Sequence, residues 1–145
     1  RRIQMKTYLC IDPGASGGWV FKCPGVPALS GNIDSIGEVM LPADVTVVIE
    51  NVPPFVGRFI PSSAAFKLGY SFGWLVGYFR HYKVVLVRPQ EWQKTLALGT
   101  TATLAGKAWK GKLKQEAQRR YPSNKITLKT ADAFCLLAHA EQHNL

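Results

Sequence analysis

Three acidic residues lie beside apolar segments, where a carboxylate is costly to bury and can serve catalysis. Asp12 and Glu50 each end an apolar or β-branched run, and Asp132 directly precedes the apolar stretch Ala133–Ala138. The chain holds only 9 Asp and Glu residues against 18 Lys and Arg. Burying a carboxylate is unfavourable unless it is paired, hydrogen-bonded or bound to a metal ion. Three such positions therefore indicate a function beyond the stability of a core.

Divalent metal binding is the chemistry that these carboxylates predict, provided that they meet in space. Hard oxygen ligands suit Mg²⁺ or Mn²⁺, and a pair of ions about 4 Å apart can activate water and neutralise the leaving oxygen of a phosphodiester. Structural roles are the alternative. Asp12 can open an Asx-turn, Asp132 can interact with a helix N-terminus, and Glu50 can face solvent. We favour a metal site because the three occur together in a basic chain.

The charge and the cysteines narrow the class of protein. The formal net charge of +9 favours a polyanionic partner such as nucleic acid, although a basic protein without such a partner is possible. Cys10, Cys23 and Cys135 form no CxxC pair, and the cysteines and histidines lack zinc-ligand spacing. No secretory signal is recognisable. We therefore expect a reducing location, namely the cytoplasm, the nucleoid, an organelle or the cytoplasm of a virus-infected cell.

Periodicity and turn residues predict a single domain over residues 5–145, with residues 1–4 as a lead-in. The predicted strands are Thr7–Asp12, Gly18–Lys22, Ile36–Leu41, Val45–Glu50 and Lys83–Val87. The predicted helices are Pro61–Tyr82, Pro89–Leu96, Lys107–Tyr121 and Thr130–His143, with a mobile loop over Leu98–Gly106. A hairpin followed by helix-linked parallel strands indicates an α/β fold, with a mixed central sheet of about five strands flanked by helices.

Three short motifs, in their order and spacing, resemble those of the RuvC-type Holliday junction resolvases. They are Ile11-Asp12-Pro13-Gly14, Val48-Ile49-Glu50 and Ala131-Asp132-Ala133. The stretch Ser62–Gly69 resembles that family's helix after its second catalytic acid, and Val87–Trp92 is more similar to the phage-like and plastid members. The likeness covers nearly the whole domain. It implies an RNase H-like fold, a homodimer, and Mg²⁺-dependent paired nicks that resolve a four-way DNA junction.

The resemblance also implies roles for individual residues. Asp12, Glu50 and Asp132 would be the catalytic metal ligands, with Mn²⁺ able to substitute for Mg²⁺ and no nucleotide cofactor. A catalytic or phosphate-contacting lysine falls on Lys110, with Lys112 as the next choice. The aromatic residue that probes the junction core falls on Phe55.

One position departs from the family pattern. The family usually places a fourth acid near the start of the last helix, often three residues before the final Asp, and here that position is Lys129. Either one ion is held by three carboxylates with water and phosphate, or a group such as Thr130 contributes. His139 lies about 10 Å along the helix from Asp132. We expect it at the edge of the core or as a charge near the helix end, rather than as a ligand.

Basic residues gather in the predicted helix that begins at Lys107. They are Lys107, Lys110, Lys112, Lys114, Arg119 and Arg120. Few acids accompany them, so we predict that these residues contact DNA phosphates. Arg58, Lys67 and Lys94 would extend this row of phosphate contacts. A solvated helix face is the alternative.

Phe55 and Phe59 follow Glu50 in a loop rich in Pro and Gly. There they can insert between base pairs or fold back on the core.

Gly69, Gly73 and Gly77 recur at every fourth position of a predicted helix, and such glycines permit close approach of another backbone. We predict a homodimer interface there, because the family's corresponding helix lies at its dimer interface, with intramolecular packing as the alternative. A membrane span is disfavoured because the apolar segment is short and contains Lys67.

Three other functions fit parts of the sequence. An RNase H-like nuclease could act on flaps or RNA–DNA hybrids, and a non-catalytic junction-binding protein would share the basic surface. The hairpin from Asp12 to Gly18 could also cradle phosphate, as in sugar kinases and actin-like ATPases. The chain is too short for the two domains that those ATPases need.

Overall fold

The computed structural model describes residues 5–53, 60–98 and 106–145, which form a mixed five-stranded sheet in the order β3-β2-β1-β4-β5. The strands are β1 (Tyr8–Ile11), β2 (Gly18–Lys22), β3 (Leu29–Asn32), β4 (Thr46–Glu50) and β5 (Lys83–Val87). β1 to β3 pair antiparallel, whereas β4 is parallel to both β1 and β5. The predicted α/β class with a mixed sheet is confirmed.

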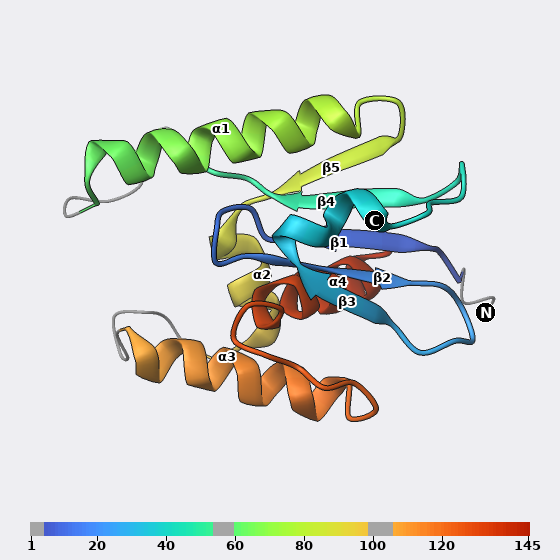
Figure 1. Ribbon diagram of the computed structural model, residues 1–145. Helices are drawn as coiled ribbons and strands as arrows, with labels where there is room; N and C mark the ends of the chain where they lie inside the picture. The colour runs from blue at the N-terminus through green and yellow to red at the C-terminus, as the bar shows by residue number, and fades with distance from the viewer. Residues whose placement is uncertain (1–4, 54–59, 99–105) are drawn as a thin grey trace.

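Helices cover both faces of the sheet (Figure 1). They are α1 (Ser62–Tyr78), α2 (Pro89–Leu96), α3 (Lys107–Arg120), α4 (Ala131–His143) and the 3-10 helix η1 (Ile33–Glu38). α4 lies on β1, β2 and β4, and it is flanked by α2 and α3. α1 and η1 pack on the opposite face. None of the helices in the described ranges combines the length and apolarity needed to span a bilayer.

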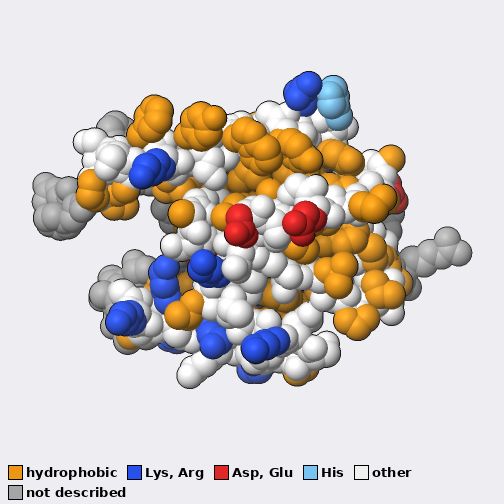
Figure 2. Space-filling model, viewed as in Figure 1, with side chains coloured by type: hydrophobic (Ala, Val, Ile, Leu, Met, Phe, Trp, Pro, Cys, Tyr) orange, Lys and Arg blue, Asp and Glu red, His pale blue; other side chains and the backbone are white. Residues whose placement is uncertain are grey.

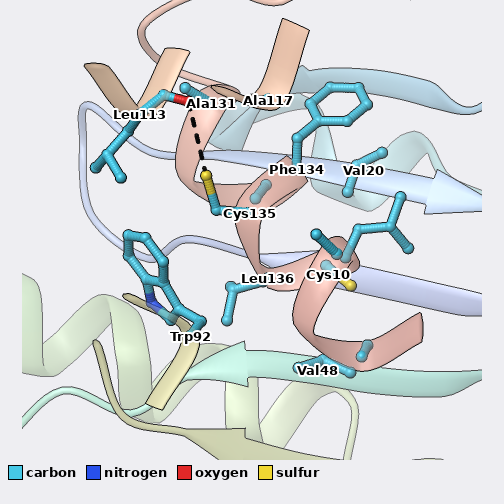
Figure 3. Packing of buried hydrophobic residues seen from close by; sticks show 14 of the residues in the cluster. Cys10, Val20, Val48, Trp92, Leu113, Ala117, Ala131, Phe134, Cys135 and Leu136 are labelled. Atoms are coloured by element: carbon cyan, nitrogen blue, oxygen red, sulfur yellow. Dashed lines mark hydrogen bonds between the residues drawn. The ribbon is translucent and has the colours of Figure 1, made fainter. Parts of the chain in front are cut away.

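Two apolar cores arise because successive side chains of a strand point to opposite faces. Cys10 of β1 and Val48 of β4 are buried on the α4 side, whereas Leu9 and Ile49 are buried on the α1 side. Figure 3 shows the α4 side, where Cys10 and Val48 lie close to side chains of α4 such as Leu136. Burial on both faces explains the β-branched composition of β4.

The prediction of a strand over Ile36–Leu41 is wrong. β3 is Leu29–Asn32, and η1 occupies Ile33–Glu38. The edge strand β3 is mostly exposed, so it lacks the apolar pattern that marks a strand, whereas Ile36 is buried from η1. Gly31 allows the close pairing with β2, because a Cβ there would lie 2.8 Å from the ring of Trp19.

The helix predicted over Pro61–Tyr82 ends earlier, at Tyr78. Backbone hydrogen bonds from Arg80 to Gly77 and from Tyr82 to Phe79 close the turn that reverses the chain into β5. The predicted helix Pro89–Leu96 is confirmed, since Pro89 stands at its first turn. Most of the loop predicted as mobile lies outside the described residues.

Candidate metal centre

Asp12, Glu50 and Asp132 meet at one edge of the sheet. Asp12 follows β1 and Glu50 ends β4, and these parallel neighbours pair with Ile11 opposite Ile49. Asp132 stands in the first turn of α4, which crosses both strands. One carboxylate oxygen from each residue lies within 4.8 Å of the others. The carboxyl ends of parallel strands share an edge, so the topology delivers the cluster.

The turn after Asp12 depends on two glycines. Gly14 has φ +103°, a conformation that residues with a side chain rarely adopt. A Cβ at Gly17 would lie 2.0 Å from the Asp12 carbonyl oxygen, so only glycine fits there. The Asp12 N–H donates to the Gly18 carbonyl at 2.9 Å, which pins the start of this loop. The glycines therefore serve the geometry that presents Asp12.

The three carboxylates destabilise one another's charged forms. Burial raises the pKa of Asp12 well above its usual range, and the charges of Asp132 and Glu50 raise it further. Burial and then Asp132 raise the pKa of Glu50 to about 7, and burial raises the pKa of Asp132. Lys110 opposes the shift in pKa at both aspartates. A cation among these oxygens would relieve the repulsion.

Trp92 holds Glu50 in place, a role that the sequence reasoning missed. The indole Nε1 of Trp92 donates to Glu50 Oε2 at 2.9 Å. Trp92 is only 1% exposed and belongs to the α4-side core (Figure 3). A lone tryptophan on the inner face of a short helix, directly after the strand beside Glu50, is the signal that could have indicated it.

A cavity of about 720 Å³ opens onto the cluster. Asp12 and Asp132 line it together with Lys67 of α1 and Lys110 of α3. Figure 2 shows a notch in the surface between α1 and α3, with Lys and Arg side chains gathered over α3. The site therefore places carboxylates and ammonium groups around one space large enough for a phosphodiester backbone.

The predicted basic residues of α3 differ in their surroundings. Lys107 and Lys110 are exposed at its start. The ammonium group of Lys112 donates a hydrogen bond to the Leu98 carbonyl at 2.7 Å. Lys112 and Lys114 are both half-buried. The structure thus distinguishes Lys110, which lines the acidic cavity, from Lys112. Phe55 and Arg58 lie outside the described residues, as does Phe59.

Both arginines near the end of α3 are tied to one acid. Arg119 and Arg120 donate to Glu116, with distances of 3.1 Å from Arg119 Nε and 2.8 Å from Arg120 Nε. These hydrogen bonds lower the pKa of Glu116 to about 2. The end of α3 is therefore better compensated in charge than its start.

The residues considered in place of a fourth acid have other surroundings. Lys129 is exposed. The Thr130 hydroxyl accepts a hydrogen bond from the Thr127 N–H at 3.0 Å. His139 is 9% exposed at the edge of the core, with Nδ1 2.6 Å from Thr95 Oγ1. In the described ranges, the metal-capable group at this edge consists of Asp12, Glu50 and Asp132.

Gly69, Gly73 and Gly77 open outward from α1. A Cβ added to any of them would meet no described atom within 4 Å. Beside them runs a row of exposed aromatic residues spaced four apart, namely Phe66, Tyr70, Trp74 and Tyr78. Figure 2 shows this hydrophobic row along α1. The glycines are thus not explained by packing within the described part of the chain.

Comparisons with known proteins concern the fold. No protein-family model matches the chain, and no curated protein matches its sequence. The chain is similar to a Thermus thermophilus RuvC structure, with a TM-score of 0.57 and 18% identity. It is also similar to T. thermophilus RuvC in complex with Holliday junction substrate, with a TM-score of 0.52 and 15% identity. Each match covers 95% of both chains. The chain has the RuvC-type, RNase H-like fold that its motifs predicted.

Proposed function

We propose that this chain is a metal-dependent endonuclease that resolves four-way DNA junctions by paired symmetric nicks, in DNA recombination or repair. The observation that carries the proposal is the meeting of Asp12, Glu50 and Asp132 within 4.8 Å, beside a cavity that Lys67 and Lys110 also line. Single structural roles for the three acids do not explain why side chains from β1, β4 and α4 converge.

The donor set fits Mg²⁺, with Mn²⁺ as a substitute. All three groups offer carboxylate oxygen, the ligand that these hard cations prefer, and their mutual repulsion marks a site that a cation would stabilise. When bound, such an ion polarises a phosphoryl oxygen and lowers the pKa of water. Asp12, Glu50 and Asp132 would hold the ion, and Trp92 would orient Glu50. Lys110 would stabilise negative charge that develops on the phosphate in the transition state.

Branched DNA is the substrate that the surface favours. The exposed Lys107 and Lys110 begin α3 on one side of the notch, and Lys67 lies on the other. Lys114 and Lys112 would extend the phosphate contacts, and Arg58 and Phe55 are assigned by resemblance alone. One of the structures that the chain resembles contains a Holliday junction substrate. Because phosphate contacts dominate such affinity, binding should weaken steeply with salt.

A homodimer would match the two-fold symmetry of a four-way junction. The aromatic row of α1 is an apolar surface of the kind that marks interaction sites. Gly69, Gly73 and Gly77 would let the helix of a second copy approach closely. Two active centres would then face the two strands that must be nicked.

The test is cleavage of a strand-labelled four-way junction with Mg²⁺ and with EDTA, mapping both nicks. We expect symmetric nicks only with Mg²⁺. Asp12→Asn should abolish nicking and leave junction affinity intact or improved, because it removes a ligand and a repulsive charge. Asp34→Asn, at an exposed acid of η1, is the matched control and should cleave normally.

The same assay separates the competing functions. Preferential cleavage of a flap or an RNA–DNA hybrid would indicate a different RNase H-like nuclease. The presence of Lys129 in place of a fourth acid favours a second candidate, a non-catalytic junction-binding protein. That protein would bind the junction tightly and nick nothing in any divalent metal ion. Full activity of Asp12→Asn would exclude the proposed centre.

A further inference from the structure

Two histidines of α4 converge on a single hydroxyl of α2. His139 Nδ1 lies 2.6 Å from Thr95 Oγ1, and His143 Nε2 lies 3.1 Å from the same atom. The two ring centroids are 4.5 Å apart. His139 stands seven residues beyond Asp132, which is about 10 Å along the helix. The pair is therefore a separate feature from the acidic cluster.

Both ring nitrogens therefore point at one small volume beside Thr95. The Thr95 hydroxyl donates to the Glu91 carbonyl at 3.2 Å, and its lone pairs can accept from the imidazoles in the tautomers that protonate these two nitrogens. In the other tautomers both nitrogens carry lone pairs, which a cation can accept at once. Histidines four residues apart on one helix face are the spacing that binds Zn²⁺ in helical metal motifs.

The surroundings admit an ion. A cavity of about 590 Å³ is lined by His139, His143 and Thr95, together with Glu91 and Lys94. Burial, followed by the charge of His143, lowers the pKa of His139, which favours the neutral ring that a metal ligand requires. Glu91 contributes a negative charge to the lining of this cavity, and Lys94 contributes a positive one.

We propose that His139 and His143 form a binding site for a nitrogen-preferring divalent metal ion, with Zn²⁺ as the probe and water completing the coordination. Imidazole suits Zn²⁺, Cu²⁺ and Ni²⁺, whereas Mg²⁺ prefers oxygen. The two sites of the molecule would thus select different ions.

The test is calorimetric titration of the whole chain with Zn²⁺ in excess Mg²⁺, with the ¹⁵N spectrum of the histidine rings as a second readout. We expect one Zn²⁺ to bind, with shifts at His139 and His143. His143→Ala should weaken this binding at least tenfold. His81→Ala removes an exposed histidine elsewhere and should change nothing.

Two results would overturn the proposal: equal Zn²⁺ affinity in His143→Ala, or ring nitrogens that do not respond to Zn²⁺. His143→Gln, which keeps a polar side chain, replaces the alanine variant if that variant fails to fold. Repeating the titration in Asp12→Asn separates this site from the nuclease centre. Zn²⁺ binding should persist there, whatever the outcome of the cleavage assay.

Discussion

Glu50 shows how one hydrogen bond can position a proposed metal ligand. Its carboxylate accepts from the Trp92 indole at 2.9 Å, and that indole is buried in the core. The hydrogen bond lowers the pKa of Glu50, against the larger raising effects of burial and Asp132. Partners that orient a metal ligand typically affect metal affinity or activity by about 10–100-fold. Trp92 would thus be a positioning residue for the proposed reaction.

Trp92→Phe should therefore weaken Mg²⁺ binding by about tenfold or more. The phenyl ring fills most of the same space but cannot donate a hydrogen bond. The measurements are the Mg²⁺ concentration for half-maximal cleavage and the Mg²⁺-induced rise in Tm. Trp19→Phe is the control, because it removes a comparable indole bond to Ser35 on the other face of the sheet. If both variants shift the Mg²⁺ requirement equally, Trp92 has only a packing role.

Lys110 and Lys112 are close in sequence but should differ in function. Lys110 lines the cavity of Asp12 and Asp132, whereas Lys112 donates to the Leu98 carbonyl. Lys110→Met should lower the cleavage rate at saturating DNA by about 10-fold or more, because a charge that stabilises the transition state is lost. Lys112→Met should lower stability and weaken junction binding, with little effect on the cleavage rate at saturating DNA. Single-turnover cleavage rates and thermal melts test this, and the reverse pattern would reassign the lysine.

At the scale of elements, α1 is the least covered helix in the described structure. Leu75 is its buried residue, whereas the glycines and aromatic residues of its outer face are open. Glycine costs a helix about 1 kcal/mol relative to alanine. Three outward glycines are therefore unfavourable for an isolated chain, and an approaching second copy would explain them.

The variant Gly73→Ala distinguishes a monomer from a dimer in which two copies pack closely through α1. In a monomer it should raise the free energy of unfolding by about 1 kcal/mol, because alanine favours the helix and a Cβ there meets no described atom. In a dimer with a close helix contact, it should weaken association. Light scattering over a dilution series and thermal melts measure both effects. Gly111→Ala in α3, where a Cβ is equally unhindered, is the control for helix propensity alone. An unchanged dimer with a higher Tm would remove the glycines from the interface.

At the scale of the whole molecule, the carboxylate cluster should link stability to pH and to the proposed metal ion. The pKa of Glu50 is raised from 4.5 to about 7, so the neutral form is favoured in the fold. Its contribution to stability is present below pH 4.5 and is lost as pH rises through about 7. The raised pKa values of Asp12 and Asp132 act in the same direction. Such a cost is typical of sites kept for function.

We therefore expect the Tm of the metal-free protein to fall between pH 4.5 and 7. Mg²⁺ competes with these protons, so the Tm rise that it induces should be larger at pH 8 than at pH 5. At 100 times its Kd the ion contributes about 2.7 kcal/mol. Asp12→Asn should be more stable than the wild type without metal at pH 8 and should gain little from Mg²⁺. A metal effect independent of pH would contradict the linkage.

Much of the fold was predictable because it depends on local pattern. Apolar or β-branched runs bounded by turn residues mark β1, β2 and β4, and Pro89 marks the start of α2. Edge strand β3 was missed because its exposed residues, Leu29–Asn32, carry no such pattern. Gly31 lies so near the ring of Trp19 that a Cβ would collide with it, and this closeness is a property of the assembled sheet.

The amino-acid sequence by itself identified the three acids, since a carboxylate beside an apolar run is costly wherever the chain folds. It also indicated that this protein has a basic surface for a polyanionic partner. Only the tertiary structure decided which side chains meet: Trp92 with Glu50, 42 residues apart, and Thr95 with His139, 44 apart. Sequence patterns encode burial and local backbone geometry. Contacts between distant residues depend on how the helices pack on the sheet, and that packing is set by the whole core at once.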